Sequence, residues 1–261
     1  MAYISPTLTL IINAVKKTAT AFGRDFNELE HLQNSVHGDK GFAQHAYDKV
    51  QKNLQEELGK IKSGFPVLCT SGNFDAKTDS YFAVCPIDGF ANFAHGNADF
   101  AVSVALIEYN IVTAAVVYSP ISDELFFAEK GSGAFKEGFR NHERLRVAAC
   151  KNAEKALTAV TNDAKILQNL TSLTSHLRIS GVASLDLAYL AAGKLDAVVA
   201  TNANPCTIGA GILLVKEAGG YVFAVGETDT RSENLQNALL GGNIFATNEA
   251  LKQKIAEAVA K

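Results

Sequence analysis

The sequence predicts an α+β protein whose two halves pack into one globular unit, with a soft boundary near residues 145–155. Three observations predict this class. The N-terminal segment has apolar residues at helical spacing, the middle is a series of short β-rich runs, and the chain after Lys151 alternates strand-like and helix-like segments. Such a pattern is typical of layered architectures. We therefore expect an N-terminal α+β part with an antiparallel sheet over residues 1–150, and a C-terminal α/β part over 151–261.

Two helices are predicted before the first strand. Ser5 is placed to cap the first helix, and Pro6 occupies the first helical position, which proline favours. Apolar residues at helical spacing extend this helix to about Gln33. The second helix is predicted over residues 43–61.

The middle of the chain predicts an antiparallel sheet. Tyr109 and Asn110 separate two β-rich runs by two residues, which is typical of a tight hairpin turn. The candidate strands cover residues 66–70, 81–84, 100–107, 111–118 and 124–128.

The C-terminal half alternates strands with helices whose ends are marked in the sequence. Gly193 and the pair Gly219-Gly220 are placed to end two helices, because glycine readily adopts the left-handed conformation after a helix. Asn248 is predicted to cap a final helix. The strands are predicted at residues 157–161, 195–200, 221–225 and 243–246, and the two preceding helices at 184–192 and 205–218.

Composition excludes several classes of protein. The 24 basic and 27 acidic residues give a net charge of −3, so no global basic field exists to bind nucleic acid directly. No apolar run reaches the roughly 18 residues that span a bilayer. The four cysteines occur singly, which is typical of reduced thiols. We therefore expect a cytoplasmic protein that binds no membrane.

Several stretches of the chain resemble the motifs of a known family. Residues 85–93 read CPIDGFANF, residues 180–197 contain SGVASLDLAY and GKLDA, and residues 204–220 contain NPCTIGAG and KEAGG. In this order, they resemble the inositol monophosphatase family, whose first motif is Asp-Pro-Ile/Leu-Asp-Gly-Thr-x-Asn-Phe. The resemblance implies a layered α-β-α-β-α sandwich of the inositol monophosphatase and fructose-1,6-bisphosphatase type. It also implies a homodimer and Mg²⁺-dependent hydrolysis of a phosphate monoester.

The metal ligands that this resemblance implies are mostly replaced. A hard cation such as Mg²⁺ requires clustered oxygen ligands with negative charge. The four carboxylate positions of the family correspond here to Asn73, Cys85, Asp88 and Thr207, with the backbone carbonyl of Ile87 beside them. Only Asp88 remains acidic. We therefore expect Mg²⁺ to bind weakly or not at all, through Asp88 and the Ile87 carbonyl.

Positions that act on water and substrate in the family are also changed. The water-activating threonine corresponds to Phe90, its aspartate partner aligns with Phe42, and a sugar-contacting glutamate corresponds to Ala200. The backbone N–H groups that face phosphate can bind an anion whatever the side chains are. We therefore expect anion binding to persist where catalysis has been lost. The resemblance places these groups at Gly89, Phe90, Gly181, Val182 and Ala183.

Other roles remain open for the same residues. Asp88 has the structural alternative of capping the turn at Gly89. Cys85, Cys206, Asp88 and His95 together would suit Zn²⁺, and Cys85 would be a nucleophile if His95 served as its base. Cysteine is also commonly buried as a small apolar residue.

Two functions from different classes follow. The first is a family member with a largely lost Mg²⁺ site, weak or inactive as a phosphatase, that acts as a binding or regulatory protein. A resemblance to the extragenic-suppressor (SuhB-type) branch implies a protein partner in the transcription machinery. The second is a Mg²⁺-dependent phosphatase of inositol phosphate or a related sugar phosphate. This second function is opposed by the residues that stand at the metal-ligand and water-activating positions, which are Asn73, Cys85, Phe90 and Thr207.

Overall fold

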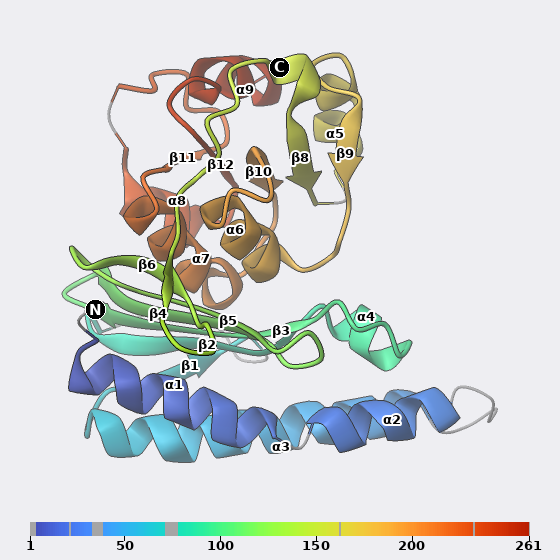
Figure 1. Cartoon of the computed structure of the whole chain (residues 1–261), viewed down its shortest axis with the longest axis vertical. Coiled ribbons are helices and arrows are strands. Elements are labelled where there is room, and N and C mark those ends of the chain that lie inside the picture. The colour runs from blue at the N-terminus through green and yellow to red at the C-terminus, as the bar shows by residue number, and fades with distance from the viewer. Residues whose placement is uncertain are drawn as a thin grey trace.

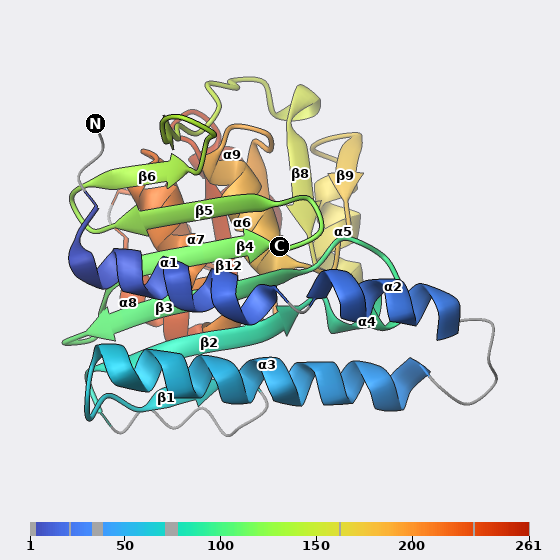
Figure 2. The ribbon, with the colours of Figure 1, turned by 60° about the horizontal axis from the view of Figure 1, so that its bottom comes forward.

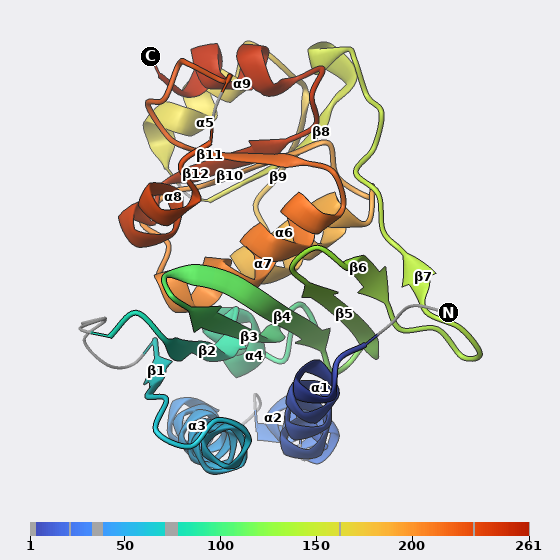
Figure 3. The same ribbon diagram turned by 90° about the vertical axis from the view of Figure 1, so that its left-hand side faces the viewer.

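The chain folds into five stacked layers, alternating helices and sheets (Figures 1 and 3). This computed structural model describes residues 4–20, 22–32, 39–70, 78–161, 163–231 and 233–260. The order of layers confirms the predicted α-β-α-β-α architecture. The helices are α1 (Pro6–Ala19), α2 (Phe22–Leu32), α3 (Asp39–Ile61), α4 (Phe90–Ala94), α5 (Ala164–Thr171), α6 (Ala183–Ala191), α7 (Pro205–Glu217), α8 (Leu235–Gly241) and α9 (Lys252–Val259).

The first sheet is an antiparallel meander, apart from one parallel pair at its edge. Its strands follow chain order, and only β1 and β2 run parallel. The predicted hairpin turn is confirmed, because both Tyr109 and Asn110 have positive φ angles, of 54° and 62°. The strands are β1 (Val67–Cys69), β2 (Tyr81–Asp88), β3 (Ala101–Glu108), β4 (Ile111–Ser119), β5 (Glu124–Glu129), β6 (Gly133–Lys136) and β7 (Glu143–Arg144). The last two strands were not anticipated from the sequence.

The second sheet is mixed, with the order β11-β12-β10-β8-β9. The three strands β10, β8 and β9 run parallel, while β12 is antiparallel to both β10 and β11. Helices α5 and α9 pack together on the outer face of this sheet (Figure 1). The strands are β8 (Leu157–Val160), β9 (His176–Arg178), β10 (Ala197–Ala200), β11 (Tyr221–Ala224) and β12 (Ile244–Thr247).

The N-terminal helices cover the outer face of the first sheet (Figure 2). Ser5 caps α1 as predicted, and its hydroxyl accepts a hydrogen bond from the N–H of Leu8 at 3.1 Å. The single helix expected to reach Gln33 is wrong, because α1 ends at Ala19 and α2 begins at Phe22. The Thr20 hydroxyl donates to the carbonyl of Lys16 at 2.9 Å, a contact that bends helices. The break lets Phe22 pack, fully buried, against Phe93 and Phe100.

Helices α6 and α7 form the middle layer and are buried between both sheets. Asn204 caps α7 through its side-chain oxygen, which accepts from the N–H of Cys206 at 2.8 Å, and Pro205 follows at the first position. A β-carbon at Gly211 would lie 2.5 Å from the Cβ of Leu187, so glycine is what lets the two helices approach this closely. One apolar cluster therefore joins α6 and α7 to the inner faces of both sheets.

The final helix begins later than predicted. Asn248 caps a turn, since its Oδ1 accepts from the N–H of Leu251 at 3.0 Å, and α9 starts only at Lys252. The Asn248 amide also donates to the carbonyls of Ala148 and Cys150, which ties this turn to the segment that links the two sheets. In the described part of the chain, no helix is long and apolar enough to cross a membrane.

Candidate functional site

The site is built where β2 ends and α4 begins. Asp88 is the last residue of β2, Gly89 has a φ angle of +83°, and Phe90 is the first residue of α4. A β-carbon at Gly89 would lie 2.8 Å from the Cγ2 of Val182 and 3.0 Å from the carbonyl oxygen of Asp99. Glycine is therefore required both for the backbone conformation and for the close approach of the loop that precedes α6.

The Asp88 carboxylate is buried and caps helix α6. Its Oδ2 accepts a hydrogen bond of 2.8 Å from the N–H of Ser184, in the first turn of α6. A carboxylate at this end also faces the positive end of the helix dipole. Burial raises the pKa of Asp88 to about 6, and hydrogen bonds from Ser184 and Gly89 only partly offset that rise. Asp88 thus joins the two halves of the chain across 96 positions.

A group of neutral side chains lies beside Asp88, centred on Cys85. The hydroxyls of Thr70 and Thr207 hydrogen-bond to the Cys85 sulfur, and the Thr70 oxygen lies 3.9 Å from it. Tyr47 joins this group, since its hydroxyl oxygen lies 2.6 Å from that of Thr70. Burial strongly raises the pKa of Cys85, so its thiol stays protonated at neutral pH. The structure therefore brings the predicted positions Cys85, Asp88 and Thr207 together.

Thr70 and Tyr47 are site residues that the sequence reasoning missed. Thr70 directly follows β1, whose parallel register pairs Cys69 with Val84 and so brings Thr70 beside Cys85. Its position at the end of a predicted strand was the available signal. Asn73, the expected ligand position, lies outside the described residues.

Aromatic side chains line the same region. The rings of Phe90 and Tyr47 meet edge to face with their centroids 5.9 Å apart. Phe42 is half-buried on α3 and, like Phe90, packs against the apolar cluster beneath the N-terminal helices. Phe90 therefore has an apolar contact at the position where the family has a hydroxyl.

The expected phosphate-facing backbone is already partly engaged. The N–H of Val182 donates to the Ser180 hydroxyl at 3.0 Å, and the N–H of Ser184 donates to Asp88. Gly181 has a φ angle of +76° and is exposed, whereas Ala183 is buried. A phosphate at this helix end would have to compete with the Asp88 carboxylate.

Two further residues shape this region. Asn92 donates to the carbonyls of Asp99 and Ser180, at 2.7 and 2.9 Å, and so fastens α4 to the loop before α6. Ala200 is fully buried at the end of β10, where its methyl group packs in the core.

Asp186 is a second buried carboxyl near Asp88. Its Oδ2 accepts a hydrogen bond of 2.7 Å from the Ser180 hydroxyl. Burial, together with the negative charges of Asp88 and Asp99, raises the pKa of Asp186 to about 7, although the hydrogen bond from Ser180 acts in the opposite direction. The sequence predicts Asp186 only as a charge on a helix face with no catalytic role, whereas the structure buries it.

The donors around Asp88 match Mg²⁺ poorly. Magnesium takes oxygen ligands and commonly one or two carboxylates, whereas Asp88 is accompanied here by a protonated thiol and hydroxyls, and the nearby Asp186 carboxyl is engaged by Ser180. Within the described ranges, no group of three or more His, Cys, Asp or Glu side chains is placed to hold a metal ion. Cys206 donates to the carbonyl of Leu68 at 3.3 Å, and burial raises its pKa to about 12, so it is also a protonated thiol.

The pKa of Asp88 predicts a pH-dependent effect of Asp88→Asn. Because the folded pKa of about 6 exceeds the ordinary value of 3.8, the fold binds the proton more tightly, and stability falls as pH rises between these values. The introduced asparagine keeps an acceptor for the Ser184 N–H but carries no charge. We expect Asp88→Asn to be about 2 kcal/mol more stable than the unmodified chain at pH 8, and nearly equal to it at pH 4.

Urea unfolding of both proteins in EDTA at a series of pH values measures this difference. Asp48→Asn, which removes an exposed carboxylate on α3, is the matched control and should change little. An Asp88→Asn variant that is less stable than the unmodified chain at pH 8 would contradict the prediction.

The layered fold and this motif define a class of protein, and the comparison with known families agrees. The model of the inositol monophosphatase family matches residues 4–261, so the chain belongs to that family. Among similar proteins, one from Mesorhizobium japonicum named inositol-1-monophosphatase is 34% identical, covering 98% of this chain and 97% of its own length. A Xylella fastidiosa protein named Nus factor SuhB is 29% identical, covering 96% of this chain and 94% of its own.

Comparison with solved structures supports the same family and fold. The crystal structure of the extragenic suppressor protein suhB from Bartonella henselae matches with a TM-score of 0.82 and 33% identity. The match covers 99% of this chain and all of that one. The predicted family and fold are therefore both confirmed.

Proposed function

We propose that this member of the inositol monophosphatase family has largely lost its Mg²⁺ site, is a weak or inactive phosphatase, and acts as a binding or regulatory protein. The observation that supports this is the neutral set of contacts around Asp88, in which Cys85 bonds to Thr70 and Thr207. At a separation of roughly 4 Å and an effective dielectric constant near 20, each missing carboxylate removes several kcal/mol of attraction for a divalent cation.

Loss of water activation adds to this effect. The Phe90 ring contacts Tyr47 and offers no proton acceptor, where general-base help is worth about 10²–10⁴ in rate. The remaining carboxylate already accepts from the Ser184 N–H. Together these contacts support a site that is shaped like that of the family but lacks its ligands and its base.

A binding role is supported by the relatives named Nus factor SuhB, which are 28–29% identical to this chain. By analogy we propose a protein partner in the transcription machinery, with contacts made to protein because the net charge of −3 gives no basic field for nucleic acid. The homodimer implied by the family resemblance belongs to the same proposal.

A second candidate function is a Mg²⁺-dependent phosphatase of inositol phosphate or a related sugar phosphate. It is favoured by the inositol-1-monophosphatases that are 34% identical to the chain, and by the retained Asp88. Mg²⁺ can be held by one or two carboxylates together with the phosphate of the substrate. In that case Asp88 and the Ile87 carbonyl would be the protein's ligands.

A phosphatase assay separates the two functions. In millimolar Mg²⁺, the purified chain should hydrolyse inositol monophosphate no faster than its Asp88→Asn variant, because little catalysis is left to abolish. The Mesorhizobium japonicum relative serves as the positive control. Mg²⁺-dependent, Li⁺-sensitive turnover that disappears in Asp88→Asn would establish the second function.

A binding experiment tests the regulatory role. Retention of the chain on immobilised RNA polymerase from the same organism would support this role, and complete separation of the chain from the polymerase on a sizing column would count against it.

A further inference from the structure

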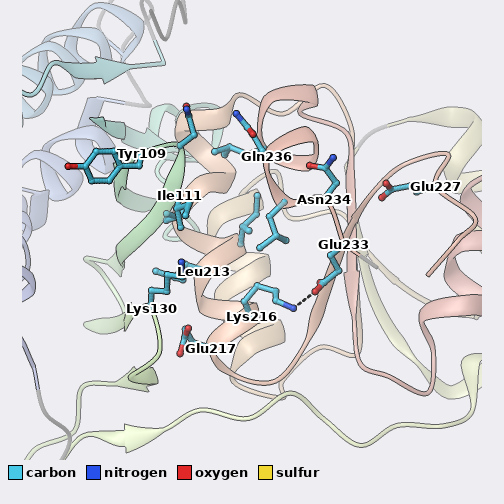
Figure 4. Close-up of a pocket in the computed structure, with 15 residues that line it drawn as sticks. Tyr109, Ile111, Lys130, Leu213, Lys216, Glu217, Glu227, Glu233, Asn234 and Gln236 are labelled. Atoms are coloured by element: carbon cyan, nitrogen blue, oxygen red, sulfur yellow. Dashed lines mark hydrogen bonds and ion pairs between the residues drawn. The ribbon is translucent and has the colours of Figure 1, made fainter. Parts of the chain in front are cut away.

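A large cavity lies at the end of α7 that is remote from Asp88 (Figure 4). It has a volume of about 780 Å³, within the range of small-molecule sites. Thr207 lies in the first turn of α7, at the motif site, and Lys216 lines the cavity near the other end of the helix. At 1.5 Å per residue these positions are about 14 Å apart along the axis. The cavity is therefore separate from the site described above.

The apolar part of the cavity wall comes from three elements. Ile111 and Val112 belong to β4, Ile212 and Leu213 to α7, and the remaining apolar residues, Leu235 and Leu239, to α8. Ile111 is 45% exposed, so part of this apolar wall is open to water. Figure 4 shows Ile111 and Lys130 on one side, with Asn234 and Gln236 on the α8 side. The apolar part of a small-molecule ligand would cover this exposed surface.

The carboxylates around the cavity all have partners. Both oxygens of Glu217 accept from backbone N–H groups, those of Gly131 and Gly133, each at 2.8 Å. Glu233 pairs with Lys216 and also accepts from the N–H of Val222. Glu227 accepts from the N–H of Ala224 at 3.1 Å.

Lys130 differs from these groups. It is exposed at the edge of the cavity, on the turn between β5 and β6, and is the one charged lining residue for which the described structure gives no side-chain partner. Lys216, the other cation, is engaged by Glu233 and lies 5.1 Å from the centre of the Tyr221 ring. Lys130 is thus the charged side chain at the cavity that is left for a ligand to pair with.

We propose that this cavity binds a small amphipathic molecule with an apolar body and a single carboxylate. The body lies between Ile111 and the α7 and α8 side chains, and the carboxylate meets the Lys130 ammonium group. A cationic headgroup at this edge of the cavity would be repelled by Lys130, while Glu217 and Glu227 are oriented toward backbone N–H groups and Glu233 toward Lys216.

The chain contains no tryptophan, so a single introduced tryptophan reports on its own surroundings. Gln236→Trp places this reporter at the cavity, and Gln168→Trp places one on the exposed side of α5 as a control. Titration with sodium octanoate should give a saturable change in the fluorescence of Gln236→Trp, with a dissociation constant of about 1 mM or lower. Gln168→Trp should show no saturable change. Absence of saturation at position 236, or an equal response at both positions, would overturn the proposal.

Matched substitutions in the Gln236→Trp background test the two halves of the proposed ligand. Ile111→Asp should weaken octanoate binding more than about tenfold, whereas Leu10→Asp, at a similarly exposed apolar residue on α1, should leave octanoate binding unchanged.

The headgroup is tested at Lys130. Lys130→Glu should weaken octanoate binding about two- to tenfold, and Lys151→Glu should not. Octylammonium should bind more weakly than octanoate to the parent and regain affinity in Lys130→Glu. Equal binding of the two headgroups would refute the assignment of a carboxylate.

Discussion

A chain that carries Asn73→Glu, Cys85→Asp, Phe90→Thr and Thr207→Asp together is expected to hydrolyse inositol monophosphate at least about 100-fold faster than the unmodified chain in Mg²⁺. Each substitution alone should change the rate very little. Residues that act as one catalytic unit are strongly non-additive, because a single restored ligand still leaves an incomplete metal site and no activated water.

The structure adds two variants to this experiment. Thr70 is the described neighbour of Cys85 at the end of β1, so Thr70→Glu should be compared with Asn73→Glu as the source of the missing glutamate. Phe42→Asp should be added in a further variant, because a threonine at position 90 needs a partner to orient it. The larger rate will identify which position supplies the ligand.

Thermal unfolding gives an independent readout of the restored site. Several carboxylates buried close together repel one another, so the multiple variant should unfold at a lower temperature than the unmodified chain without metal. Mg²⁺ should recover most of that loss, since a ligand that binds only the folded state stabilises it. A variant that folds and gains stability from Mg²⁺ but does not turn over would contradict the prediction, and would place the catalytic defect beyond the ligands and Phe90.

Replacement of Phe93 by alanine is expected to lower the free energy of unfolding by about 3–5 kcal/mol. Phe93 is the last residue of the motif, lies on α4 and is fully buried. Its ring centroid lies 5.7 Å from that of Phe22 and 4.9 Å from that of Phe100, in edge-to-face contacts. Removal of the ring leaves a cavity beneath the motif and removes the contact that holds α2 against α4.

Urea unfolding at fixed pH measures this loss. Phe139→Ala is the matched control, because Phe139 is 99% exposed in the loop between β6 and β7, and its removal should change stability by less than about 0.5 kcal/mol. Equal effects of the two substitutions would show that the aromatic cluster does not stabilise the first sheet.

The sequence predicted most of the sheet strands because their apolar runs and turns are local signals. The hairpin at Tyr109 and Asn110 is an example, since two adjacent residues determine it. The break between α1 and α2 was missed, because helical spacing continues through it and the bend depends on a Thr20 side-chain bond and on Phe22 finding distant aromatic partners. Strands β6 and β7 were missed because they are short and are stabilised by pairing with a neighbour.

The site was predictable as a list of positions but not as a set of contacts. The motif identified Asp88, yet its bond to Ser184 spans 96 positions and depends on the packing of α6 against the first sheet. Tyr47 and Thr70 carry no recognisable motif, and only the parallel register of β1 and β2 reveals that Thr70 lies beside Cys85. The cavity beside Lys130 has no local sequence signal, because its walls come from three separate elements.

The middle position of α6 and α7 has a consequence for synthesis of the chain. The first sheet is complete at Arg144, but the helices that cover its inner face end only at Glu217. A ribosome adds roughly 5–20 residues per second, so this remaining stretch of about 70 residues takes on the order of 4 to 15 seconds to make. During that time Ala105, Val117 and Phe126 have no partner layer to bury them. The nascent chain therefore passes through a stage in which one apolar face of a completed sheet is exposed, a condition that favours aggregation.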